Sequence, residues 1–138
     1  MTLWCIFRSP LMIGGDLMEL SSEMKPLFSN REVLEVDQNS LNNHQLSREE
    51  QKIIWVADIP WTQNKYLAFF NIGDGDSLIE VKLKDIGFEN QCQIRDLWKG
   101  INLGSFTSTF SHNIVPHGSG LYKISIIKWF TVICTRNL

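Results

Sequence analysis

The sequence has few of the features that mark several common functional classes. Its three cysteines, Cys5, Cys92 and Cys134, lie far apart and form no CxxC or Cys/His spacing, so they predict no metal site. Its net charge of −2 and the lack of a basic stripe give no electrostatic footprint for nucleic acid. No apolar run reaches the roughly 20 residues of a membrane-spanning helix. We therefore expect no metal, no cofactor, no nucleic acid and no membrane among its ligands.

The composition is that of a packed globular chain, with 43% hydrophobic and 20% charged residues over 138 positions. The first apolar run, Met1 to Phe7, is unusual because no polar or capping residue precedes it. A secretory signal would place its positive charge before the apolar core, whereas Arg8 follows it. We therefore expect the chain to start inside a domain whose earlier part is missing.

Residues 1–36 predict a helix, a short strand and two further helices. Leu3 to Phe7 fit one short helix, which Ser9-Pro10 would end. The wholly apolar run Leu11 to Ile13 is typical of a strand buried on both faces of a parallel sheet. Ser21 and Asn30 are expected N-caps of the helices that follow. This order is typical of an α/β layer.

Residues 37–51 are polar and predict a linker, and the pattern then changes to strands. β-Branched and aromatic residues predict an antiparallel β-sandwich over residues 52–124. Asn71 to Asp76 (NIGDGD) has alternating acidic residues, but it lies between strands, so a hairpin turn is favoured over a calcium loop. The expected strands are 53–59, 65–72, 77–83, 93–97, 105–115 and 118–124.

Five segments in order resemble the C-terminal part of glycoside hydrolase family 27, the α-galactosidases or melibiases. They are WCIFRSPLMIGGDL, NREVLEVDQNSL, KYLAFFNIGD, IRDLWKGINLGSF and VPHGSGLYKI. The resemblance implies a (β/α)₈ (TIM) barrel followed by an antiparallel β-sandwich. On that basis the first helix ends the seventh barrel helix, Leu11 to Ile13 is the eighth strand, and the next two helices close the barrel.

The resemblance also implies that the catalytic residues lie elsewhere. A retaining glycosidase needs two carboxylates about 5 Å apart. In the family both are aspartates from the fourth and sixth barrel strands, and neither motif is present, so we assign no catalytic residue here. Asp16 follows the implied eighth strand; it either lines the rim of the sugar pocket or orients the turn into the next helix, and the second role is favoured.

The aromatic residues offer a second route to sugar binding. Trp55 and Trp98 lie in strand patterns and are expected in the sandwich core or at its contact with the barrel. Trp61 follows Pro60 in a turn and is the candidate for an exposed stacking platform. His117 has no accompanying nucleophile pattern, so a structural turn is favoured there.

The leading hypothesis is a fragment of an α-galactosidase-type retaining hydrolase, inactive alone, whose α-galactoside substrates bind through the missing barrel. The alternatives are a non-catalytic carbohydrate-binding β-sandwich and an inactive structural remnant. Residues 125–138 form an atypical apolar tail beyond the resemblance. The sequence leaves the oligomeric state open.

Overall fold

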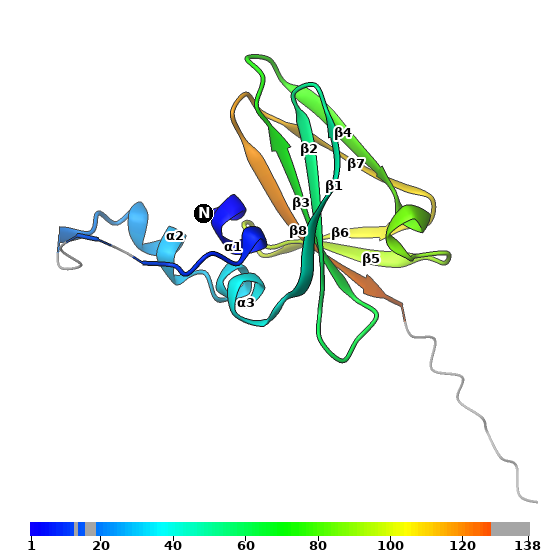
Figure 1. Cartoon of the computed structure of the whole chain (residues 1–138), viewed down its shortest axis with the longest axis horizontal. Helices are drawn as coiled ribbons and strands as arrows, with labels where there is room; N and C mark the ends of the chain where they lie inside the picture. Colours follow the sequence, from blue (N-terminus) through cyan, green and yellow to red (C-terminus); the bar gives the residue numbers. More distant parts are fainter. Residues whose placement is uncertain (13, 16–18, 128–138) are drawn as a thin grey trace, which may run out of the picture.

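The computed structural model describes residues 1–12, 14–15 and 19–127, and this part of the chain has three short helices followed by eight strands (Figure 1). A 3₁₀ helix, η2 (Leu83–Ile86), follows the fourth strand. None of the helices in these residues is long and apolar enough to cross a membrane. The elements are α1 (Thr2–Phe7), α2 (Met24–Ser29), α3 (Arg31–Asn39), β1 (Leu41–Glu49), β2 (Lys52–Asp58), β3 (Lys65–Asn71), β4 (Ser77–Lys82), β5 (Cys92–Asp96), β6 (Ile101–Phe106), β7 (Thr109–Ile114) and β8 (Ser119–Ile126).

The strands form two antiparallel sheets, as predicted. Six strands make one sheet in the order β1-β2-β3-β8-β5-β6, and β4 and β7 make the other. The core between the sheets is rich in aromatic rings: Phe110 of β7 lies 5.6 Å from Phe69 of β3 and 4.9 Å from Tyr122 of β8, measured between ring centroids. Burying this interior supplies the main driving force for folding of the sandwich.

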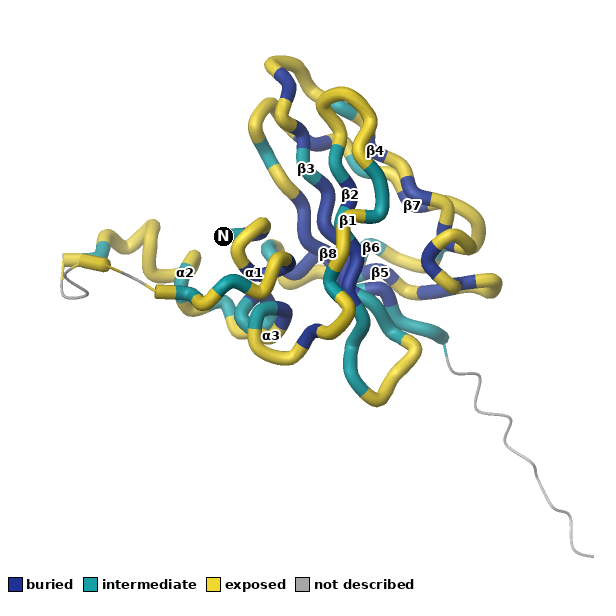
Figure 2. Tube along the Cα trace, in the orientation of Figure 1, coloured by how far each residue is buried: buried dark blue, intermediate teal, exposed yellow. Residues whose placement is uncertain are grey.

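Strands β2 and β3 are apolar on both faces, and this explains their nearly continuous hydrophobic runs. Ile54 and Phe69 point into the core between the sheets, whereas Ala57 and Ala68 belong to a second cluster on the opposite face. Helices α1 and α3 cover that second face (Figure 1), and the buried strands appear dark blue in Figure 2. The two helices contribute Cys5, Ile6, Val33 and Val36 to the second cluster.

Asn30 caps α3, as predicted. Its side-chain oxygen accepts hydrogen bonds from the backbone N–H groups of Glu32 and Val33, at 3.0 and 3.2 Å. Its amide also donates to the backbone oxygen of Leu97, 2.9 Å away. The other expected cap is wrong: α2 begins at Met24 with Glu23 as its N-cap, and Ser21 Oγ accepts from the backbone N–H of Met24 in the turn before the helix. Asn30 therefore starts the helix and ties it to the sandwich.

Two predictions for the N-terminal half are not met. Leu11 and Met12 form no strand, and Ile13 lies outside the described residues. A strand buried on both faces needs neighbours on each side, and no described strand pairs with these residues. The predicted linker over residues 37–51 is wrong, because α3 continues to Asn39 and β1 pairs with β2. Polar residues suit β1, since it is an exposed edge strand.

The turn at residues 71–76 is not a hairpin. β3 pairs with β2 and β8, whereas β4 pairs with β7, so the turn carries the chain from one sheet to the other. The buried Asn71 stabilises this crossing, because its amide donates to the backbone oxygens of Gly75 and Ile114, at 2.7 and 2.9 Å. A buried amide without hydrogen-bond partners would destabilise the fold, so the two backbone oxygens are needed at this position.

Two strand boundaries also differ from the prediction. The single strand expected over residues 105–115 is two strands, because β6 pairs with β5 and β7 pairs with β4. β8 extends to Ile126, which pairs with Cys92, so the first residues of the predicted tail belong to the sheet. The remainder of that tail, from residue 128, lies outside the described residues.

Candidate functional site

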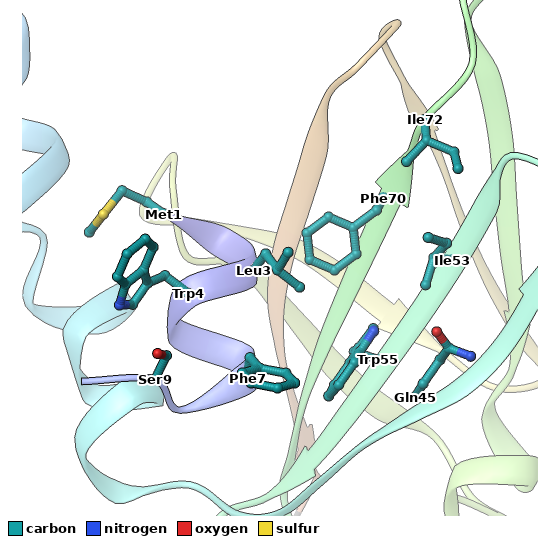
Figure 3. Close-up of a pocket in the computed structure, with 10 residues that line it drawn as sticks. All are labelled: Met1, Leu3, Trp4, Phe7, Ser9, Gln45, Ile53, Trp55, Phe70 and Ile72. Carbon is teal, nitrogen blue, oxygen red and sulfur yellow. The ribbon is translucent and has the colours of Figure 1, made fainter. Parts of the chain in front are cut away.

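An open apolar groove of about 690 Å³ lies between α1 and the outer face of strands β2 and β3 (Figure 3). Leu3, Trp4 and Phe7 project from α1 on one side. The other side is formed by strand residues and by Ile72, just after β3, and Phe7 meets Trp55 edge to face, with 5.5 Å between ring centroids. The remaining lining residues are Met1, Ser9, Gln45, Ile53 and Phe70.

Polar contacts at both ends of α1 hold this side of the groove in place. At the start, Thr2 Oγ1 accepts hydrogen bonds from the indole N–H of Trp98, 2.8 Å away, and from the hydroxyl group of Ser119, 2.9 Å away. At the end, Arg8 adopts a left-handed conformation (φ 57°) and its guanidinium donates to the backbone oxygens of Asp37 and Ser40. The helix is therefore fixed against both α3 and the sandwich.

The chemistry of the groove suits contact with another apolar protein surface. Its lining residues carry no charged side chain. Leu3 and Phe7 are 53% and 59% exposed although they lie beside a packed cluster. Exposed apolar side chains gathered in one patch mark interaction surfaces more often than single exposed ones do. Cys5 is buried on the same helix, and burial raises its pKa to about 11, so its thiol stays protonated and weakly reactive.

Several of the described carboxylates serve as structural ties. Glu32 forms a two-point ion pair with Arg95, with N–O distances of 2.7 and 2.8 Å, and these hydrogen bonds hold the pKa of Glu32 below its usual range. Asp58 pairs with Lys65, and the hydrogen bond from that lysine lowers the pKa of Asp58. No group of three His, Cys, Asp or Glu side chains able to hold a metal is found in the described residues.

Of the two predicted site residues, the structure describes one. Asp16 lies outside the described residues. Trp61 is fully exposed in the β2–β3 loop and has a positive φ of 62°, which is rare for a bulky residue. Hydrogen bonds from Ile59 N–H to Asn64 O and from Thr62 Oγ1 to Ile59 O close this loop, at 3.1 and 2.9 Å. The indole is therefore presented to solvent on a defined loop.

The other aromatic predictions are met in part, because Trp55 lies on β2 whereas Trp98 lies in the turn after β5 and not in a strand. Trp55 and Trp98 are both half-buried at the contact with α1. His117 lies in the exposed turn before β8, where its ring nitrogen is 3.0 Å from Asp74. That histidine therefore links two turns and has no nucleophile beside it among its described hydrogen-bond partners.

A small hollow of about 220 Å³, lined by both polar and apolar side chains, lies at one end of the sandwich core and was not predicted from the sequence. It lies where β5 and β8 approach β7. Buried and exposed residues alternate along β7, and this alternation places His112 inward, between Phe110 and Ile114. The prediction of one strand over residues 105–115 joined β6 and β7 and did not separate this pattern. The residues that shape it include Asp96, Trp98, Lys99, His112, Ser119 and Tyr122.

Comparisons with known proteins give a consistent result. The family model described as "Alpha galactosidase C-terminal beta sandwich domain" matches residues 49–124. Alpha-galactosidase 2 of Arabidopsis thaliana is 23% identical over 128 residues, which cover 90% of this chain and 32% of that protein. This chain therefore spans about a third of the length of that relative.

Solved structures extend the similarity to the helices. A GH27 β-L-arabinopyranosidase from Geobacillus stearothermophilus is 38% identical with a TM-score of 0.87, over 92% of this chain and 29% of that one. Alpha-galactosidase I from Mortierella vinacea has a TM-score of 0.81 at 22% identity, over 89% and 33% of the two chains, and shows the fold alone.

Proposed function

Because the chain belongs to the family of alpha-galactosidase C-terminal β-sandwich domains, we propose that it is the C-terminal part of a retaining glycoside hydrolase. The intact protein would remove terminal α-galactosyl units from its substrates. Residues 1–36 would complete the barrel, and residues 52–124 would form the sandwich domain beside it. In this arrangement the sandwich positions the barrel's last helices and supplies no group to the reaction.

The apolar groove is the observation that carries this proposal. Leu3, Trp4 and Phe7 stay 53%, 45% and 59% exposed in the groove, so their full burial needs a surface beyond the described residues. The family's barrel is a surface of the right chemistry, because the outer helices of such barrels pack through apolar side chains. Packing there would bury the largest exposed apolar side chains of α1.

The names of the relatives support two candidate substrates. α-Galactosides are named by the curated relatives, and a β-L-arabinopyranoside is favoured by the 38% identical structure. The two sugars share their ring configuration and differ by the hydroxymethyl group of galactose. Discrimination between them would depend on barrel residues that contact this group, and a pocket distinguishes such a small difference by about 1–3 kcal/mol.

A chimera tests the proposal directly. The barrel of the Geobacillus enzyme, followed by this chain in place of its own matching part, should be soluble and hydrolyse nitrophenyl β-L-arabinopyranoside. The same chimera with Phe7→Glu should lose solubility or activity, whereas Leu78→Glu, on the exposed face of β4, should not. A folded chimera whose Phe7→Glu variant keeps full activity would show that the groove does not receive the barrel.

Asp16 can be assigned in the same chimera. We propose that it orients the turn into the following helix, with the rim of the sugar pocket as the alternative. Asp16→Asn should then leave KM for the arabinoside unchanged and lower thermal stability slightly. A raised KM with unchanged stability would instead indicate that Asp16 lines the sugar pocket.

A non-catalytic carbohydrate-binding domain is the second candidate, and the exposed indole of Trp61 favours it. Aromatic faces stack on the apolar faces of sugar rings, and the closed β2–β3 loop would limit the conformational entropy lost on binding. Galactosides at millimolar concentration should then change tryptophan fluorescence, and Trp61→Ala should abolish that change. An unchanged signal would exclude this candidate and leave the structural remnant as the alternative to the hydrolase.

A further inference from the structure

The hollow at the end of the sandwich is lined by both polar and apolar side chains and has the size of a small-ligand site. Its volume of about 220 Å³ is below the roughly 300–1,000 Å³ of sites for drug-sized ligands, so it suits a molecule with a single ring. It is lined by side chains from three separate parts of the chain, at the end of β5, on β7 and at the start of β8. Aromatic side chains and hydrogen-bonding groups both line the hollow.

Asp96 provides a rigid carboxylate at this site. Its side chain is only 7% exposed, and Oδ1 accepts hydrogen bonds from the backbone N–H groups of Trp98 and Lys99, each at 3.0 Å. The other oxygen, Oδ2, is 3.8 Å from the ammonium group of Lys99. A carboxylate oxygen can accept more than one hydrogen bond, so Oδ2 has capacity for a ligand hydroxyl group.

Tyr122 provides a hydroxyl group that has no hydrogen-bond partner among the described residues. Its ring is buried, and the hydroxyl lies over Gly120, where any side chain would collide with it. No fully buried side-chain oxygen or nitrogen in this part of the structure lacks a partner, so the hydroxyl must open onto the hollow. Burial, and then the charge of Asp96, raise the pKa of Tyr122, so the hydroxyl remains a donor.

Two rings complete the lining. The indole nitrogen of Trp98 is already bonded to Thr2, so the contribution of Trp98 to a ligand is its apolar surface. His112 lies against Tyr122, with 5.6 Å between ring centroids, and offers a ring nitrogen on the opposite sheet. A flat apolar surface beside several hydroxyl-binding groups matches a pyranose, which has both apolar C–H faces and hydroxyl groups.

We propose that this hollow binds one monosaccharide of the galactose or arabinose type, at a site formed entirely by the sandwich. The choice of sugar rests on the proposed function, whereas the site itself rests on the geometry of Asp96, Trp98 and Tyr122. In an enzyme that releases such sugars, the site would hold product or a chain end of the substrate. Binding is expected to be weak, since few groups contact a single ring.

Titration of the 138-residue chain with galactose and with arabinose tests this inference. Both tryptophan fluorescence and the NMR signal of the Trp98 indole N–H should change and saturate in the millimolar range. Tyr122→Phe keeps the ring and removes only the hydroxyl, so it should weaken binding about fivefold or more. The matched control is Tyr66→Phe, which changes a tyrosine that is also buried but belongs to the cluster beside α1.

Several results would overturn the inference. Binding that survives Tyr122→Phe unchanged, or that is lost in Trp61→Ala, would place the sugar elsewhere. An equal response to glycerol would show a nonspecific solvent effect, and no saturation with either sugar would show that the hollow does not bind them. Because this experiment measures no hydrolysis, an inactive chimera would leave its outcome unaffected, and a failed titration would leave the hydrolase proposal standing.

Discussion

Asn30 shows how one side chain connects the helical segment to the sandwich. Its oxygen caps α3, and its amide reaches Leu97 after β5, 67 residues later in the chain. Asn30→Ala should lower the free energy of unfolding by about 1–2 kcal/mol, because cap and cross-link are both lost. Urea denaturation measures this loss. Asn39→Ala removes an exposed bond within the same helix and should cost less than about 0.5 kcal/mol; equal losses would contradict the connecting role of Asn30.

The ion pair between Glu32 and Arg95 should make stability depend on pH. Arg95's hydrogen bonds lower the pKa of Glu32 in the folded chain. The stabilisation is therefore fully present above the unfolded pKa, about 4.3, and is lost as pH falls through the lower folded value. Glu32→Gln should show a smaller fall in melting temperature between pH 6 and 3, measured by circular dichroism. The effect is modest because both side chains are partly exposed. If Glu32→Gln leaves the pH profile unchanged, this ion pair does not contribute to the acid sensitivity of the fold.

At the scale of elements, α1 is packed on one side and exposed on the other. Its inner side chains are buried, whereas Leu3, Trp4 and Phe7 line an open groove. We expect the isolated chain to self-associate through this face at high concentration. Leu3→Glu should shift it toward the monomer in sedimentation velocity experiments, because a charge opposes burial of that face.

The control for this prediction is Leu78→Glu on β4. Leu78 is 59% exposed but does not line the groove, so this variant should associate as the unchanged chain does. If Leu3→Glu and Leu78→Glu have the same effect, general surface hydrophobicity explains the association. If neither changes it, another surface is responsible.

Local patterns predicted the elements well where burial follows the sequence period. The strands at β2, β3 and β8 and the cap at Asn30 were predictable, because apolar runs and a capping side chain act over a few residues. β1 was not, since an edge strand needs no apolar face and its hydrogen bonds come from β2. The crossing after β3 was also missed, because Asn71 is held by Gly75 and by Ile114, 43 residues away.

The candidate sites were predictable only in part, for the same reason. The exposed Trp61 followed from a local turn signal. The groove and the hollow did not, because each is formed by segments far apart in sequence, such as α1 with Trp55 and Asp96 with His112. The predictions of a barrel and of a substrate class came from the family resemblance, because no periodicity in these residues could indicate either.

At the scale of the whole molecule, the sandwich and the helical segment differ in how far their apolar surfaces are buried. The six- and two-stranded sheets enclose a closed core, whereas the helices before them leave an apolar face open. A retaining glycosidase needs two carboxylates about 5 Å apart around one anomeric carbon. Glu32 and Asp58 are instead held in ion pairs, and Asp96 accepts from the backbone, so none of these is placed for that reaction.

We therefore expect that this chain alone does not hydrolyse α-galactosides. Even if two of its carboxylates met, no surrounding barrel would hold the substrate, and loss of positioning alone can raise the barrier by several kcal/mol. The measurement is release of nitrophenol from its α-galactoside by the purified chain, with the chimeric enzyme as the positive control. Turnover above background that disappears in Asp16→Asn would place an active site in the N-terminal segment. Turnover that persists in that variant, and disappears when Asp96 is changed to Asn, would instead place the chemistry in the sandwich.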